Sequence, residues 1–193
     1  MHPLHSYLNT YTSSLISEED FEIIRSHFVY KKLRKRQYLL EEGKICKHMA
    51  FIVKGAMRKF CIDEKGKEHV ANLYIENWWA GDRESFVMLT PTIYNIEALE
   101  NCELLLVSKE STVLLSNQSP SFNRFRLRLD EKNNIATQKR ITSNISSSAK
   151  ERYEDFANCY PEFLQRFPQH LIASYLGITK DTLSRVLKQT LQR

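Results

Sequence analysis

Five polar residues close to the C-terminus have the types and the spacing that base recognition requires. They are Lys180, Asp181, Ser184, Arg185 and Lys188. At about 100° per residue, these side chains project from one side of a helix. Arginine and lysine donate to guanine, an acid accepts from the cytosine amino group, and a hydroxyl can do either. The pattern therefore predicts a helix whose polar face contacts base edges in a major groove of DNA.

The other side of this segment is mainly apolar, and a short helix and a turn precede it. The residues on that side are Leu183, Val186, Leu187 and Thr190. Pro168 suits the first turn of the preceding helix, in which Ala173 is small enough for a second helix to approach. Gly177 provides a left-handed turn, and Thr179 caps the second helix. The Ala-x-x-x-Gly-x-Thr layout predicts a helix-turn-helix rather than an ordinary amphipathic hairpin with a solvated charged face.

The charge of the chain is modest as a whole and concentrated at this end. In 193 residues, 28 Lys and Arg stand against 23 Asp and Glu, which gives a formal net charge of +5. That value permits an anionic partner without demanding one. From residue 161 onward, the basic residues outnumber the two acids, Glu162 and Asp181. The basic residues there are Arg166, Lys180, Arg185, Lys188 and Arg193. We therefore expect the C-terminal segment to attract DNA phosphates.

Other site chemistries lack the residues that they need. The four cysteines are scattered without a C-x-x-C pair, which indicates reduced thiols in a cytoplasmic protein and no iron–sulfur cluster. The six histidines show no metal-ligand spacing beyond a weak His2/His5 pair. A P-loop and a Gly-x-Ser-x-Gly elbow are absent, and the longest aliphatic runs are far too short to span a membrane. We expect no metal, no cofactor, no catalytic residue and no membrane segment.

The region before the C-terminal segment changes from short strands to long helices. A helix is predicted at about 18–28, and short β-like pieces follow up to residue 107 with glycines at their corners. Such a series predicts an antiparallel sandwich, jelly roll or barrel. Residues 121–145 lack Gly and Pro, which predicts one long helix. Phe122, Phe125, Leu129 and Ala136 share an apolar stripe on this helix. Ser148-x-x-Glu151 is a capping box that opens another helix.

The order of these elements and several motifs resemble the Crp/Fnr family of transcription regulators over nearly the whole chain. The motifs are Tyr38-Leu-Leu-Glu-Glu-Gly43, Phe51-Ile-Val-Lys-Gly55, Asp63-Glu-Lys-Gly-Lys-Glu68, Gly81-Asp82, Ile96-Glu-Ala-Leu-Glu100 and the most specific one, Ile172-Ala-Ser-Tyr-Leu-Gly-Ile-Thr-Lys-Asp-Thr-Leu-Ser-Arg185. The resemblance implies an α+β fold with an antiparallel jelly roll of the cyclic-nucleotide-binding type. It further implies a sensor domain over 1–118, a dimerisation helix over 119–146 and a helix-turn-helix domain over 147–193. With this role for the long helix, we expect the dimer seam on Phe122, Phe125 and Leu129.

The resemblance also implies how the recognition helix works. In the family, an acid, a small residue and an arginine contact bases; here they are Asp181 (where Glu is commoner), Ser184 and Arg185. Lys180 lies beside them. We assign phosphate contacts to Gln169, Thr179 and Lys188. The family usually continues into a β wing, whereas this sequence ends at Arg193. We therefore expect fewer backbone contacts with DNA and an unchanged base preference.

The nucleotide pocket of the family holds ribose with an acid and clamps the cyclic phosphate with an arginine. Gly81-Asp82 matches the first position, and Thr92 stands where the arginine would be. No basic residue lies between Arg83 and Lys109, so the clamp is missing unless Arg83 turns inward. We therefore expect no binding of cyclic AMP. The candidate effector pocket comprises Trp79, Gly81, Asp82, Arg83, Glu84, Ser85 and Thr92.

These observations favour a homodimer that binds a pseudo-palindromic site in double-stranded DNA through two recognition helices about 34 Å apart. RNA polymerase is a further candidate partner, and the small-molecule effector is left open. A cupin-like jelly-roll enzyme is the alternative from another class. It needs a cluster of histidine and carboxylate ligands, which His69 beside Glu68 does not supply. A degenerate family member that acts through protein contacts is the third hypothesis.

Overall fold

The computed structural model describes residues 2–12 and 15–191, without the side chains of residues 190 and 191. The chain forms two compact units. The first unit comprises Met1–Cys61 and Asn72–Lys132, and the second comprises Ile62–Ala71 and Asn133–Arg193. The sequence predicted a boundary after residue 146, where the long helix ends, whereas the compact units divide that helix after Lys132.

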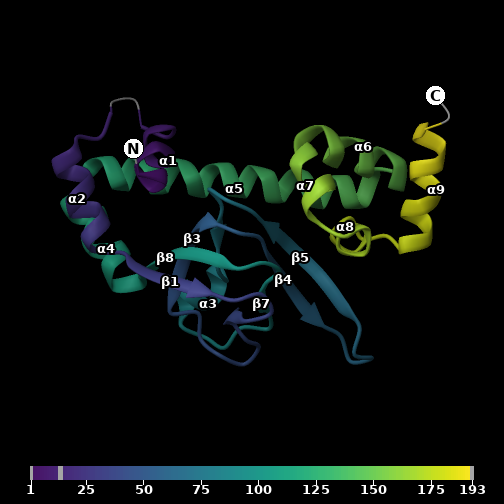
Figure 1. Cartoon of the computed structure of the whole chain (residues 1–193), viewed down its shortest axis with the longest axis horizontal. Helices are drawn as coiled ribbons and strands as arrows, with labels where there is room; N and C mark the ends of the chain where they lie inside the picture. Colours follow the sequence, from purple (N-terminus) through teal and green to yellow (C-terminus); the bar gives the residue numbers. More distant parts are fainter. Residues whose placement is uncertain (1, 13–14, 192–193) are drawn as a thin grey trace. The chain divides into compact units, whose positions relative to one another are not determined.

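Two four-stranded antiparallel sheets form the sandwich that the short strands predicted (Figure 1). One sheet has the order β1-β8-β3-β6, with β1 Val29–Leu33, β8 Cys102–Ser108, β3 His48–Lys54 and β6 Trp79–Ala80. The other has the order β2-β7-β4-β5, with β2 Tyr38–Leu40, β7 Asn95–Ala98, β4 Met57–Ile62 and β5 Glu68–Tyr74. Apart from β4 and β5, neighbouring strands are not consecutive in the sequence, so strand pairing brings residues from distant segments together.

The sandwich has one apolar core, and a glycine sits at the tight turn between β3 and β4. The core includes Ala50, Ile52, Met57, Ile96, Ala98 and Leu104. Gly55 has a φ of +104°, and a Cβ placed there would lie 2.6 Å from the Cys102 sulfur and 2.9 Å from the Asn101 carbonyl oxygen. Both its conformation and its close contact with β8 therefore require glycine.

The first unit also contains four helices and the beginning of the long helix. They are α1 Pro3–Asn9, α2 Glu18–Ser26, α3 Arg83–Met88, α4 Lys109–Gln118 and, as the long helix, α5 Pro120–Ser146. The predicted cap of α2 is confirmed, because the Ser17 hydroxyl accepts a hydrogen bond from the Asp20 amide. Of these helices, α1, α3 and α4 were not predicted from the sequence.

The prediction of a dimer seam on the first turns of α5 is wrong. Phe122 and Phe125 are both 2% exposed and pack inside their own chain, in a cluster with Leu4, Leu8 and Phe21. Leu129 packs against the same cluster. Helices α1 and α2 supply part of this cover, together with α4, β3 and β8, and α1 is too short for its amphipathic period to identify it in the sequence.

The second unit is helical except for the end of the β4–β5 hairpin, residues 62–71. It contains the last part of α5, followed by α6 Ala149–Cys159, α7 Pro161–Arg166, α8 Gln169–Tyr175 and α9 Lys180–Leu191. The predicted capping box of α6 is confirmed: the Ser148 amide donates to the Glu151 carboxylate, and the Glu151 amide donates to the Ser148 hydroxyl. Among the helices described, none is both long enough and apolar enough to cross a membrane.

Candidate nucleic-acid interface and effector site

Helices α8 and α9 are joined by the turn that the sequence predicted. Gly177 has a φ of +66°, and a Cβ there would meet no atom within 4 Å, so conformation alone calls for glycine. The Gly177 amide donates to the Ser174 carbonyl, and the Ile178 amide to the Ala173 carbonyl, each over 3.0 Å. The Thr179 hydroxyl accepts from the Thr182 amide over 3.1 Å, which confirms the predicted cap.

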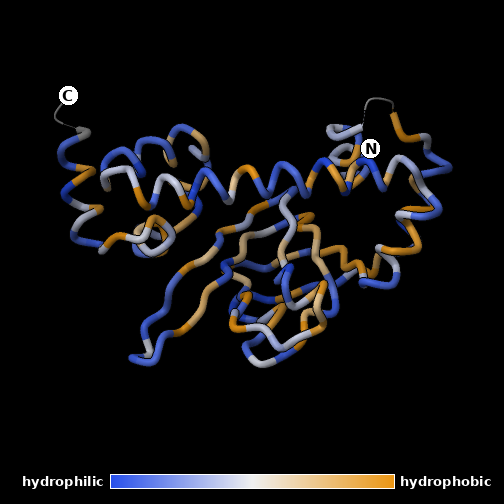
Figure 2. The backbone as a smooth tube through the Cα atoms, turned by 180° about the vertical axis from the view of Figure 1, so that it is seen from behind, coloured by the Kyte–Doolittle hydropathy of each residue, from blue (hydrophilic) through white to orange (hydrophobic). Residues whose placement is uncertain are grey.

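The two faces of α9 differ as the sequence predicted. Leu183 and Val186 are buried in the helical unit, and Figure 2 shows how hydrophobic and hydrophilic residues alternate along this helix. All five residues of the predicted polar face, and both Gln169 and Thr179, are exposed. The Arg185 guanidinium donates to the Thr182 hydroxyl over 3.4 Å, which supports it on its own helix. The Thr190 side chain and Arg193 lie outside the described part of the chain.

Helix α8 is held by the β4–β5 hairpin through residues that the sequence did not single out. The Val70 amide donates to the Ser174 hydroxyl over 2.9 Å. The Arg140 guanidinium donates to the Ala71 carbonyl and lies 4.9 Å from the centre of the Tyr175 ring. These contacts join residues that are far apart in the sequence, so no local pattern could have identified them. They fix α8, the helix that precedes α9, within the second unit.

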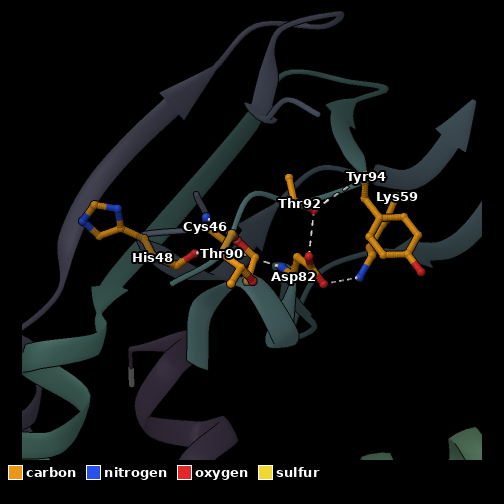
Figure 3. Close-up of polar contacts among 8 residues, drawn as sticks. Cys46, His48, Lys59, Asp82, Thr90, Thr92 and Tyr94 are labelled. Carbon is orange, nitrogen blue, oxygen red and sulfur yellow. Dashed lines mark hydrogen bonds and ion pairs between the residues drawn. The ribbon is translucent and has the colours of Figure 1, made fainter. Parts of the chain in front are cut away.

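In the first unit, Asp82 and Thr92 from the predicted effector pocket do lie together (Figure 3). The Thr92 hydroxyl donates to one Asp82 carboxylate oxygen over 2.7 Å. The Lys59 ammonium on β4 pairs with the other oxygen over 3.1 Å. Asp82 therefore has a largely buried cationic partner, which comes from β4 and not from the segment between Arg83 and Lys109. In the sequence, strand alternation places Lys59 on the same face of β4 as the core residue Met57, which was an available signal.

Gly81 and Ser85 are buried next to this pair. A Cβ at Gly81 would lie 2.3 Å from the Met49 sulfur, so the backbone there can only carry glycine unless Met49 moves. The Ser85 hydroxyl accepts from the Cys46 amide over 2.8 Å and donates to the Thr90 carbonyl. The Asp82 amide points at the Cys46 sulfur over 3.4 Å, and burial raises the pKa of the Cys46 thiol.

Three of the predicted pocket residues lie elsewhere. Trp79 packs in the cluster around the first helices, with its ring 5.5 Å from that of Phe51. Arg83 does not turn toward Asp82, because it is exposed and pairs with Asp130 on α5. Glu84 is exposed. A cavity of about 320 Å³ adjoins Cys46 and Gly81, but its lining does not include Lys59, Asp82 or Thr92.

Comparison with known proteins gives a domain family for one part of the chain and a fold for nearly all of it. Residues 30–118 match the cyclic nucleotide-binding domain family. No protein of curated function matches the sequence. A CooA variant from Carboxydothermus hydrogenoformans has a TM-score of 0.72 at 14% identity, covering 96% of this chain and 84% of that one.

Two further solved structures share the fold over most of this chain. FixK2 from Bradyrhizobium japonicum has a TM-score of 0.69 at 18% identity, covering 86% of this chain and 85% of that chain. The global regulator CLP from Xanthomonas campestris, described as responsive to c-di-GMP, has a TM-score of 0.66 at 15% identity, with coverages of 91% and 92%. The chain thus joins a region that matches the cyclic nucleotide-binding domain family to a helical C-terminal part. Its fold is the one that these solved structures share, in agreement with the α+β fold that the resemblance to the Crp/Fnr family implied.

Proposed function

We propose that this protein is a DNA-binding transcription regulator that acts as a homodimer on a pseudo-palindromic site. The observation that carries the proposal is the exposed polar face of α9 above a buried apolar face, next to a turn that needs Gly177. Helix α8 and the cap at Thr179 support this face from behind. A helix presented in this way can enter a major groove with its N-terminal residues toward the bases.

Each exposed group has a defined role in the proposal. Arg185 donates two parallel hydrogen bonds to a guanine, and Asp181 accepts from a cytosine amino group. Ser184 and Lys180 contact neighbouring bases. Gln169, Thr179 and Lys188 contact phosphates, which orients the helix in the groove without specifying the sequence.

A dimer needs a seam other than the buried phenylalanines of α5. The later turns of that helix carry three isoleucines that are about half exposed or more, with exposed fractions of 48% for Ile135, 54% for Ile141 and 81% for Ile145. At 100° per residue they fall within about a third of the helix circumference. A groove of about 550 Å³ lies beside Ile135, lined also by Thr142 and Ser146. We propose that the same face of a second copy covers these isoleucines.

The direct test is selection of a binding site from random double-stranded DNA, followed by affinity measurements on the selected site. We expect a pseudo-palindrome with half-sites one helical turn apart, and an affinity that falls steeply with salt. Arg185→Ala is the test variant. Arg34→Ala is its control, because Arg34 is also an exposed arginine but belongs to the first unit. Arg185→Ala should weaken specific binding by about 1–3 kcal/mol, and Arg34→Ala should leave it unchanged.

If no sequence is enriched, or if Arg185→Ala has no effect on any DNA, α9 is not a recognition helix. The protein would then act through protein contacts. Light scattering during size-exclusion chromatography tests the seam: Ile141→Glu should convert a dimer to a monomer, while Ala136→Glu, at an exposed position on the opposite side of α5, should leave the dimer intact.

A further inference from the structure

A buried ion pair stands in the first unit at the position predicted for the effector. The Lys59 and Asp82 side chains are only 12% and 9% exposed, and their charged atoms lie 3.1 Å apart. A charge that is removed from water is costly unless it is paired and hydrogen-bonded, so this pair depends on both of its members.

The polar atoms around the pair already have partners. One Asp82 oxygen faces Lys59, and the other accepts from Thr92. The Lys59 ammonium lies 4.0 Å from the centre of the Tyr94 ring, which is a cation–π distance. The Tyr94 amide in turn donates to the Thr92 hydroxyl over 3.1 Å, as Figure 3 shows. The Asp82 carboxylate and the Tyr94 ring face together hold the ammonium group, and the Thr92 hydroxyl fixes the carboxylate.

We propose that the Lys59 ammonium is the built-in occupant of the effector site, so that the site is closed to cyclic nucleotides and needs no diffusible ligand. The proposal rests on the proposed function only in treating the first unit as the sensor. A cyclic phosphate would have to separate Lys59 from Asp82 and would then face the negative charge of that carboxylate. The class of ligand that fits is a small primary ammonium, and it can enter only when the lysine side chain is removed.

Chemical rescue tests this proposal. Lys59→Ala removes the three outer carbons and the ammonium, which n-propylammonium replaces. We expect Lys59→Ala to lower the Tm by roughly 10 °C, because Asp82 is left buried without its cation. About 50 mM n-propylammonium should restore at least half of that loss, since a ligand that binds only the folded state stabilises it.

Three controls isolate the effect. The amine should not stabilise wild-type protein or the double variant Lys59→Ala/Asp82→Asn, and n-propanol should not replace it. Lys54→Ala, at an exposed lysine at the end of β3, should change neither the Tm nor the response to amine. An unchanged Tm in Lys59→Ala, or equal stabilisation of the double variant by the amine, would overturn the proposal.

Two measurements on the wild-type chain apply even if Lys59→Ala does not fold. Acylation of amines followed by mass spectrometry should label Lys54 at least tenfold faster than Lys59 in the folded protein, and equal rates would contradict the closed pair. Calorimetry with cyclic AMP and cyclic GMP should give no binding. Micromolar binding of either nucleotide would overturn the proposal and identify Lys59 as a phosphate clamp. None of these experiments contains DNA, so their failure leaves the test of DNA recognition unaffected.

Discussion

The two polar clusters of this chain use similar residues in opposite ways. Around Asp82, an acid, a lysine and a threonine are buried and bonded to one another. On α9, an acid, two lysines, a serine and an arginine are exposed, and none of the ion pairs between described residues involves them. The comparison shows that residue type alone does not define a binding site. A surface can bind a partner when its polar groups are left unpaired, and a cluster that satisfies itself holds the fold together.

The largest expected effect comes from removing the apolar support under the exposed cluster. Leu183 is buried beneath the polar face of α9. Leu183→Ala should lower the free energy of unfolding by about 2–5 kcal/mol, because it removes buried carbon atoms and leaves a cavity. Ser184→Ala, on the exposed side, should change it by less than about 0.5 kcal/mol. Urea titration followed by circular dichroism measures both, and similar losses in the two variants would show that α9 has no two-sided character.

The next effect concerns the self-satisfied cluster. Thr92→Val keeps the shape of the side chain but removes the hydroxyl that donates to Asp82. One carboxylate oxygen then stays buried without a donor, and we expect a loss of about 1–3 kcal/mol in the free energy of unfolding. Thr92→Ser retains the hydroxyl and is the matched control. If the Thr92→Val and Thr92→Ser variants have the same free energy of unfolding, the hydrogen bond between Thr92 and Asp82 does not contribute to stability. The residues around Asp82 would then depend on one another less than their geometry indicates.

The two clusters also differ in whether the sequence could predict them, because one depends on local spacing and the other on contacts between distant segments. The turn at Gly177, the cap at Thr179 and the two faces of α9 arise from residues within one or two helical turns of each other, so spacing was enough. Lys59 lies on β4, whereas Asp82 is the N-cap residue of α3, 23 positions further along the chain, and only the three-dimensional fold brings the two side chains together. The burial of Phe122 was missed because it depends on helices that precede it by about a hundred residues.

A smaller effect separates the roles within the exposed cluster. Lys188 is assigned to a phosphate and Arg185 to a base, so the two variants should differ in kind. Lys188→Gln should weaken binding to all DNA sequences alike and reduce the slope of log K against log salt by about 0.9, the value for one released counterion. Arg185→Ala should instead reduce discrimination at one base pair. Affinities measured at four salt concentrations, on the selected site and on its single-base variants, distinguish the two roles. A loss of base preference in Lys188→Gln would mean that Lys188 contacts a base and not a phosphate.

The smallest effect tests a single hydrogen bond that is neither fully buried, like those around Asp82, nor exposed, like the polar face of α9. Its acceptor, Ser174, belongs to α8. The Val70 amide donates to the Ser174 hydroxyl over 2.9 Å. Ser174→Ala should cost about 1 kcal/mol, and Ser174→Thr should retain the bond. Hydrogen exchange provides a local measurement, since the Val70 amide should exchange about fivefold faster in the alanine variant when local opening exposes it. An unchanged rate would mean that the hairpin end, residues 62–71, is held in the second unit by the contacts of Arg140 alone, because that guanidinium still reaches the Ala71 carbonyl and the Tyr175 ring.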